Sequence, residues 1–384
     1  MKKQWLSLLL CVTLIYSALT GCSSPSAPSS AATAAATEAA SSETQKAAGS
    51  SEKTKITLNI GSGHAETNPW VQAVEDFFVK EVSSRVKERT DYEIEWIKSY
   101  GGSIISLGNE LEGTRDGLVD IGCVILAFEA SRIPLESIAY NCPFACSEPD
   151  VAAKVLHSML DEFPEFRADF EKYNQKLLGI GISDQYGLFS TKEVSSLNDL
   201  SGVKIGAAGL NLSWIEGSGA VGVQTSLNDT YQNLQTNVCG ATIQPTHSCV
   251  NTKIYEVAPY YLDANFNVIS PFNALTINMD TYHSLPAEVQ EILNEVGGEY
   301  LDYEAGYIAT VHAEDLKVLE ENGCTITTLD WDGKVEWASK LEDTVHVFVK
   351  SLNDAGYDGA KIVGRYYELL EEHGLDRVRD WQID

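Results

Sequence analysis

The sequence predicts an α/β protein of two lobes, and three observations favour this class. Strand-like and helix-like patterns alternate from Lys55 to Asp384, which is typical of α/β sheets. That segment is longer than one typical domain, so we expect two lobes. A helical pattern from Ser284 to Asn322 is longer than one lobe requires.

The N-terminus has the pattern of a secretory signal. Two lysines precede an apolar run from Trp5 to Leu19, and Leu19–Cys22 has the form of a lipobox. The run is too short for a membrane-spanning helix, and polar sequence follows at once. We therefore expect residues 1–21 to be a lipoprotein signal peptide and Cys22 to carry a lipid. An ordinary signal peptide, in which Cys22 has no role, is the alternative.

Residues 22–54 are nearly all Ser, Ala, Thr, Pro and Glu. Such sequence buries too little apolar surface to offset its ordering entropy. We expect a flexible linker with a mean reach of about 30 Å. The chain carries a formal net charge of −28, which no cluster of Lys or Arg interrupts. This argues against nucleic acid as a partner and leaves the lipid as the expected contact with a membrane.

The first part of the folded segment predicts a strand–helix–strand–helix–strand order, the pattern of a parallel sheet. Apolar residues alternate or cluster in the expected strands Ile56–Ile60, Tyr92–Trp96 and Ile121–Leu126. Asn68 and Pro69 suit the cap and first turn of one helix, and a second is expected near Leu107–Asp116.

The pattern then repeats, which predicts a second α/β lobe. Leu177–Ile182, Val203–Ile205 and Cys239–Ile243 have the character of strands. Helices are expected over Leu212–Gly219 and Asn228–Thr236, the second with Tyr231 and Leu234 on its buried side.

The helix expected over Ser284–Asn322 has Ser284 as its cap and Pro286 in its first turn. Only Gly297 and Gly298 interrupt its apolar spacing. At about 55 Å, it either bends at the glycine pair or braces both lobes.

Catalytic motifs are weak in this chain, and we expect neither an enzyme nor a metal or cofactor site. Gly217–Gly222 has the spacing of a dinucleotide fingerprint, but it ends a helix instead of linking a strand to one. His247 and Cys249 lie close in sequence, yet two ligands do not make a zinc site. A secreted hydrolase is the competing class, and it would require a buried nucleophile–base pair in the cleft.

Six cysteines follow Cys22, and outside the cytoplasm they can form disulfides. The nearest pairs in sequence are Cys142 with Cys146 and Cys239 with Cys249. Spacing does not give connectivity, so disulfides and free buried thiols both stay open. The six are Cys123, Cys142, Cys146, Cys239, Cys249 and Cys324.

A series of short motifs runs along the folded segment. In order and spacing they resemble the solute-binding proteins of tripartite ATP-independent periplasmic (TRAP) transporters, over nearly all of Lys55–Asp384. The motifs are Tyr100–Ser103, Leu107–Gly108, Glu110, Arg115–Asp120, Pro143–Phe144, Ser195–Ile205, Tyr231–Asn237, Pro245 and Tyr255–Val257.

The resemblance implies a two-lobed periplasmic-binding-protein-like fold with hinge strands and a long helix spanning both lobes. We expect residues 55–183 plus 272–310 to form lobe I, and 184–271 plus 311–384 to form lobe II. It also implies that a small organic solute is held between the lobes and delivered to the small and large membrane subunits of a TRAP permease. We expect a lipid-anchored monomer at the cell surface or in the periplasm. A sensor that feeds a signalling partner is the alternative.

One departure from the family bears on the ligand. The resemblance places an arginine that pairs with the ligand's carboxylate directly after Ile205, and this chain has Gly206 there. A buried carboxylate without a cation is costly, so we expect a neutral or weakly polar ligand. The rival expectation is a carboxylate receptor in which His64 or Arg132 restores the charge. The ligand-binding residues expected from the resemblance and the strand ends are Ser62, His64, Ile125, Gln185, Tyr186, Gly206, Asn211, Trp214 and Gln244.

Overall fold

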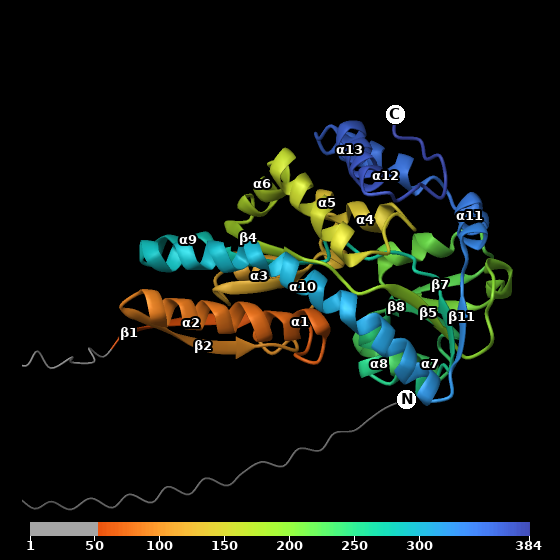
Figure 1. The fold of residues 1–384 in the computed structure, drawn as a ribbon, viewed down its shortest axis with the longest axis horizontal. Helices are drawn as coiled ribbons and strands as arrows, with labels where there is room; N and C mark the ends of the chain where they lie inside the picture. The colour runs from red at the N-terminus through yellow and green to blue at the C-terminus, as the bar shows by residue number, and fades with distance from the viewer. Residues whose placement is uncertain (1–52) are drawn as a thin grey trace, which may run out of the picture. The chain divides into compact units, whose positions relative to one another are not determined.

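The computed structural model describes residues 53–384, and Figure 1 shows two β-sheets with helices packed around them. The predicted signal peptide over 1–21, the lipid site at Cys22 and the linker up to Glu52 lie outside the described residues. We call the first sheet with its helices lobe I and the second sheet with its helices lobe II.

The sheet of lobe I has the strand order β2-β1-β3-β10-β4. Strand β1 is parallel to β2 and β3, whereas β10 is antiparallel to β3 and β4. The parallel arrangement predicted for β1, β2 and β3 is confirmed, and the whole sheet is mixed because β10 returns from lobe II and inserts between β3 and β4. The strands are β1 (Thr54–Gly61), β2 (Tyr92–Ser99), β3 (Ile121–Ile125), β4 (Gln175–Gly181) and β10 (Asn273–Asn278).

The sheet of lobe II has the order β11-β9-β5-β8-β6-β7. Strand β6 is parallel to β7 and β8, and β5 is antiparallel to β8 and β9. The strands are β5 (Tyr186–Ser190), β6 (Lys204–Ala207), β7 (Val221–Gln224), β8 (Ala241–Pro245), β9 (Tyr260–Asp263) and β11 (Thr325–Thr328).

Two chain segments cross between the sheets and hydrogen-bond to each other. Residues 182–185 lead from β4 to β5, and residues 264–272 lead from β9 to β10. The backbone N–H of Ser183 donates to Ile269 O at 3.0 Å, and Gln185 forms an antiparallel bridge with Val268. These paired crossings are the hinge strands that the two-lobed fold predicts.

The predicted long helix is α10 (Ala287–Glu321), 35 residues and one unbroken α-helix, about 52 Å long. It packs on β4 in lobe I and reaches β11 in lobe II, as Figure 1 shows, so it braces both lobes instead of bending. The predicted cap at Ser284 was wrong. Ser284 ends a separate helix, α9 (Met279–Ser284), and Pro286 occupies the cap position of α10.

Three other predicted helices are confirmed: the one that begins after Asn68, the one near Leu107–Asp116 and the one over Asn228–Thr236. Asn68 occupies the cap position of the first helix, but its side chain donates to Ala65 O instead of capping. The helix predicted over Leu212–Gly219 was wrong. A short 3₁₀ helix covers Gly209–Ile215 instead, and Gly217, with a φ of 75°, turns the chain away from a helical path. The α-helices are α1 (Pro69–Ala73), α2 (Lys80–Arg89), α3 (Glu110–Arg115), α4 (Ile138–Asn141), α5 (Pro149–Glu162), α6 (Glu165–Glu171), α7 (Thr230–Gln235), α8 (Thr246–Asn251), α11 (Trp331–Lys340), α12 (Thr344–Asp354) and α13 (Gly359–Glu372).

The C-terminal helices lie on lobe I. Figure 1 shows α12 and α13 beside α4 and α5, and these pairs are in contact. The predicted boundaries assign residues 311–384 to lobe II. The contacts of α12 and α13 with α4 and α5 therefore connect residues assigned to lobe II with residues assigned to lobe I. The boundaries themselves stay a prediction.

Two further properties bear on the sequence-based alternatives. Within residues 53–384, no helix has the length and apolar character that crossing a membrane requires. The six cysteines of this segment are free thiols, five of them buried and Cys324 partly exposed.

Candidate ligand-binding site

A narrow cavity lies between the two lobes; its unoccupied space is about 320 Å³ when the solvent at its mouth is included, and about 20 Å³ is open to the centres of water molecules. Both lobes contribute to its wall, so its shape depends on how closely they approach. Lobe I and its crossing segment supply His64, Trp70, Ile125, Ala127, Phe128 and Phe272, and lobe II supplies Tyr186, Ala208, Ser226, Leu227, Gln244 and Pro245.

The cavity lies at the carboxyl ends of the parallel strands in both sheets. In lobe I, β1 ends at Gly61 and β3 at Ile125; in lobe II, β6 ends at Ala207 and β8 at Pro245. Many lining residues end or follow parallel strands, and Tyr186 and Phe272 lie at the amino ends of the antiparallel strands β5 and β10, which reach the same edge. Ligands of open α/β sheets bind at this edge, because the loops that leave the strands there are free to carry side chains.

The loop after β1 is fixed by a buried carboxyl group. Glu110 accepts the backbone N–H of Gly63 at 3.1 Å and that of Gly108 at 2.7 Å. Burial raises the pKa of Glu110 to about 8. A Cβ atom at Gly63 would lie 2.4 Å from the backbone of Leu107, so only glycine fits this close approach. The position of the next residue, His64, is thereby set.

The His64 ring is held by its neighbours and stays uncharged. The indole N–H of Trp70 donates to His64 Nδ1 at 3.2 Å, and Trp70 packs edge-on against Phe272. His64 is 3% exposed, and burial lowers its pKa to about 4. His64 Nε2 has no hydrogen-bond partner among the described residues.

The wall from lobe II is built on a second local network. Gln244 Nε2 donates to Thr230 Oγ1 at 3.4 Å, and Thr230 Oγ1 donates to Ser226 O at 3.1 Å. These bonds join the end of β8 to the turn after β7, which carries Ser226 and Leu227 into the wall.

No charged side chain lines the cavity. Arg132, the proposed substitute cation, is instead paired with Glu129 at 2.6 Å and Glu112 at 2.7 Å. His64 is neutral at pH 7 because of its lowered pKa. Neither residue supplies a positive charge in this arrangement.

Four of the nine expected site residues line the cavity: His64, Ile125, Tyr186 and Gln244. Ser62 lies just outside and accepts the His64 backbone N–H at 3.2 Å. Gln185 lies in the crossing segment, where Nε2 donates to Ser147 O at 2.7 Å.

Gly206, Asn211 and Trp214 also lie outside the lining. A Cβ atom at Gly206 would meet Thr225 Cγ2 at 2.9 Å and Cys239 Sγ at 3.2 Å, so that direction is already filled. Asn211 is fully buried, and its side-chain amide has no hydrogen-bond partner within residues 53–384. Trp214 is fully buried and packs edge-on against Tyr186. Direct roles for these residues in binding stay predictions.

Sequence reasoning missed most of the aromatic wall. The spacing of Trp70 predicts a core residue, and in the structure Trp70 packs in the core and also lines the cavity. Phe272 ends the crossing after the cis Ser270–Pro271 bond, and no local pattern marks it. The lining residues that were not predicted are Trp70, Ala127, Phe128, Ala208, Ser226, Leu227, Pro245 and Phe272.

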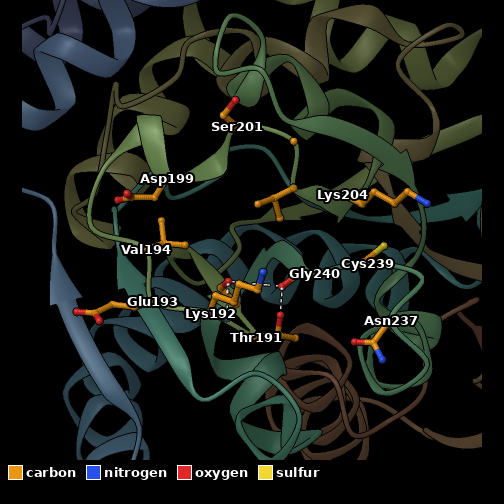
Figure 2. A pocket seen from close by; sticks show the side chains of 13 residues that line it. Thr191, Lys192, Glu193, Val194, Asp199, Ser201, Lys204, Asn237, Cys239 and Gly240 are labelled. Carbon is orange, nitrogen blue, oxygen red and sulfur yellow. Dashed lines mark hydrogen bonds between the residues drawn. The ribbon is translucent and has the colours of Figure 1, made fainter.

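A second groove lies at the opposite end of the lobe II sheet. Figure 2 shows Lys204 and Asp199 on its two sides, with Thr191 and Gly240 hydrogen-bonded between them. It is larger and open, with about 1140 Å³ of space, but its lining comes from residues 190–240 alone. Movement of one lobe against the other would not enclose a ligand there. Among residues 53–384 there is also no cluster of side chains suited to a metal ion.

Two solved structures with this architecture come from proteins whose ligands are small organic acids. An extracytoplasmic solute receptor of Bordetella pertussis that binds pyroglutamic acid has a TM-score of 0.70 and 20% identity, covering 81% of this chain and 99% of that one. A TRAP solute-binding protein of Rhodoferax ferrireducens in complex with benzoate has a TM-score of 0.74 and 16% identity, covering 83% and 98%. At these identities the likeness shows the fold.

Sequence comparison gives the family. The ectoine/5-hydroxyectoine-binding periplasmic protein UehA of Ruegeria pomeroyi is 23% identical over 261 residues, 66% of this chain and 76% of that protein. Residues 60–351 match the family described as bacterial extracellular solute-binding protein, family 7, or DctP. This match spans most of the chain and agrees with the motifs, the two lobes and the shared cavity. The chain therefore belongs to the DctP family of TRAP solute-binding proteins, which are receptors and not enzymes.

Proposed function

We propose that this receptor captures a neutral or weakly polar organic solute in the cavity between its lobes and delivers it to a two-subunit TRAP permease. One observation carries the proposal: the cavity draws its walls from both lobes and none of its lining side chains is charged. Aromatic and aliphatic side chains suit an apolar body, and His64 and Gln244 supply polar contacts.

Capture and delivery follow from the shared wall. A ligand in the cavity contacts both lobes only when they are close together, so its binding energy favours the closed state. The crossings at 182–185 and 264–272 are the segments about which the lobes separate. A permease that distinguishes closed from open receptors would then respond to loaded ones.

The charge of the ligand is where this proposal differs from the ligands of the similar solved structures. Benzoate and pyroglutamic acid carry carboxyl groups, which are ionised in neutral water. In this chain a buried carboxylate would meet no lysine or arginine among the lining residues, and leaving it unpaired is costly. We therefore propose an uncharged ligand.

Thermal unfolding with a solute panel tests this proposal. We expect uncharged solutes with an apolar body to raise the Tm by about 5 °C or more at a hundred times Kd, and simple dicarboxylates to leave it unchanged. Lys204→Ala, in the groove of Figure 2, is the control and should keep the shift. Strong stabilisation by dicarboxylates alone would reject the neutral ligand, and loss of the shift in the control would reject the cavity.

We also propose that Cys22 anchors the receptor through a lipid, which keeps it near the permease and raises its local concentration. The support is the apolar run followed by Leu19–Cys22. In bacterial fractionation, we expect the wild type in the membrane fraction and Cys22→Ala in the soluble fraction or retained as precursor. Cys11→Ala, inside the apolar run, should fractionate as the wild type does. Cofractionation of Cys22→Ala with the wild type, correctly processed, would contradict the anchor.

A further inference from the structure

Two polar atoms of opposite hydrogen-bonding character remain free at the cavity, one on each wall. They are His64 Nε2 in lobe I and Gln244 Oε1 in lobe II. Each atom's character is fixed by the hydrogen bonds of neighbouring residues, and together they restrict the ligand more than charge alone does.

The character of His64 follows from Trp70. An indole N–H can only donate, so His64 Nδ1, which lies 3.2 Å from Trp70 Nε1, must accept. The proton of the neutral ring is therefore on Nε2. This N–H is buried, has no partner among the described residues, and belongs to a side chain that lines the cavity. The Nε2–H group of His64 is therefore a buried donor that lacks an acceptor among the described residues.

The character of Gln244 follows from Thr230. The Thr230 hydroxyl proton is used in the bond to Ser226 O at 3.1 Å, so Thr230 Oγ1 can only accept from Gln244. The atom 3.4 Å from Thr230 Oγ1 is therefore the amide nitrogen Nε2. This orientation leaves the carbonyl oxygen Oε1 as the free group of a side chain that lines the cavity. Gln244 is an acceptor that lacks a donor among the described residues.

We propose that the ligand is an uncharged compound with an amide-type group, a lactam or carboxamide, on a compact apolar body. Its carbonyl oxygen accepts the N–H of His64, and its own N–H donates to Gln244 Oε1. This assignment rests on the proposed function and narrows it. It also explains how the ligand joins the lobes, because one half of the amide contacts each wall.

A carboxylate of the same shape fits this pair of groups poorly. Both of its oxygens are acceptors, so one of them would face Gln244 Oε1, another acceptor. It would also be buried without a cation among the lining residues. Trp70, Phe128, Phe272 and Leu227 line the same cavity and favour a flat apolar body beside the amide.

Matched pairs of probes test the assignment by isothermal titration calorimetry. Benzamide and benzoate, and nicotinamide and nicotinate, differ in the amide or carboxylate group while the ring is the same. We expect at least one amide to bind at least tenfold more tightly than its carboxylate. Tighter binding of the carboxylates overturns the amide assignment but leaves a working receptor. Failure of both amides also overturns it, and if no panel solute binds at the cavity, the proposed function fails as well.

Two near-isosteric variants test the contacts. His64→Phe removes the donor, and Gln244→Met removes the acceptor. Each should weaken amide binding about tenfold to a hundredfold, because the ligand's partner atom is left unpaired. Lys204→Ala, which lies away from the cavity, should not change affinity. Unchanged affinity in both cavity variants would contradict the assignment.

The tautomer of His64 can be measured without any ligand. Histidine side-chain 15N NMR at pH 7, assigned by the signals missing in His64→Phe, should show a neutral ring with the proton on Nε2. A proton on Nδ1, or a charged ring at pH 7, would overturn the proposal whatever the probes do.

Discussion

Replacing Trp214 by alanine should lower the free energy of unfolding by about 3–5 kcal/mol. Trp214 is fully buried, and its ring packs against Tyr140, Tyr186 and Phe266. Its indole N–H also donates to Tyr140 O at 2.8 Å. The substitution therefore removes a large packed volume and leaves a buried carbonyl unpaired. Urea unfolding followed by circular dichroism measures the change.

Trp331 is the matched control. It begins α11 and is 50% exposed, so Trp331→Ala should change the free energy of unfolding by at most about 0.5 kcal/mol. The pair also tests the original expectation that Trp214 contacts ligand. Wild-type stability of Trp214→Ala combined with loss of solute binding would favour that expectation over a core role.

Replacing Gly297 by alanine should destabilise the protein by about 2 kcal/mol, although alanine is the better helix former. A Cβ atom at Gly297 would lie 2.5 Å from Leu178 O and 2.7 Å from Leu178 C. Both are backbone atoms of β4, so α10 and the strand would have to move apart. Gly179 faces the same contact, with its own added Cβ 2.4 Å from Gly297 O.

Gly298, the next residue, should respond in the opposite direction. A Cβ atom there would meet nothing within 4 Å, and alanine in place of glycine favours a helix by about 1 kcal/mol. Thermal unfolding of both variants distinguishes the two effects. A steric clash lowers the Tm of Gly297→Ala, and a higher helix propensity raises the Tm of Gly298→Ala. Equal Tm values for Gly297→Ala and Gly298→Ala would contradict the close approach of α10 to β4.

The glycine pair illustrates what periodicity can predict. The spacing of apolar residues from Val289 to Val311 predicted the long helix, because one buried stripe continues through it. Spacing did not distinguish a bend at Gly297 from a tight contact, since both use glycine. The mixed sheet of lobe I escaped prediction for a related reason: the partners of β10 lie far away in sequence.

In the candidate site, too, residues next to recognisable strands could be predicted, whereas residues placed by contacts between distant segments could not. His64 and Ile125 were expected from the family resemblance, and Tyr186 was expected because it follows a strand that the sequence marks clearly. Phe272 could not, because it enters the wall from a crossing segment whose path depends on both lobes. The orientations of His64 and Gln244 depend on Trp70 and Thr230, and hydrogen-bonding direction leaves no trace in composition or spacing.

The contact between Gly297 and β4 determines which contacts change when the lobes separate. Backbone atoms in such close contact cannot slide past one another, so we expect the N-terminal half of α10 to stay with lobe I when the lobes separate. Further along the helix, α10 meets His247 of lobe II through two hydrogen bonds, from Asp315 at 2.8 Å and from the Tyr307 hydroxyl at 3.2 Å. If the lobes separate as proposed, these polar contacts at the C-terminal half of α10 are the ones that must break and form again, whereas those at its N-terminal half persist.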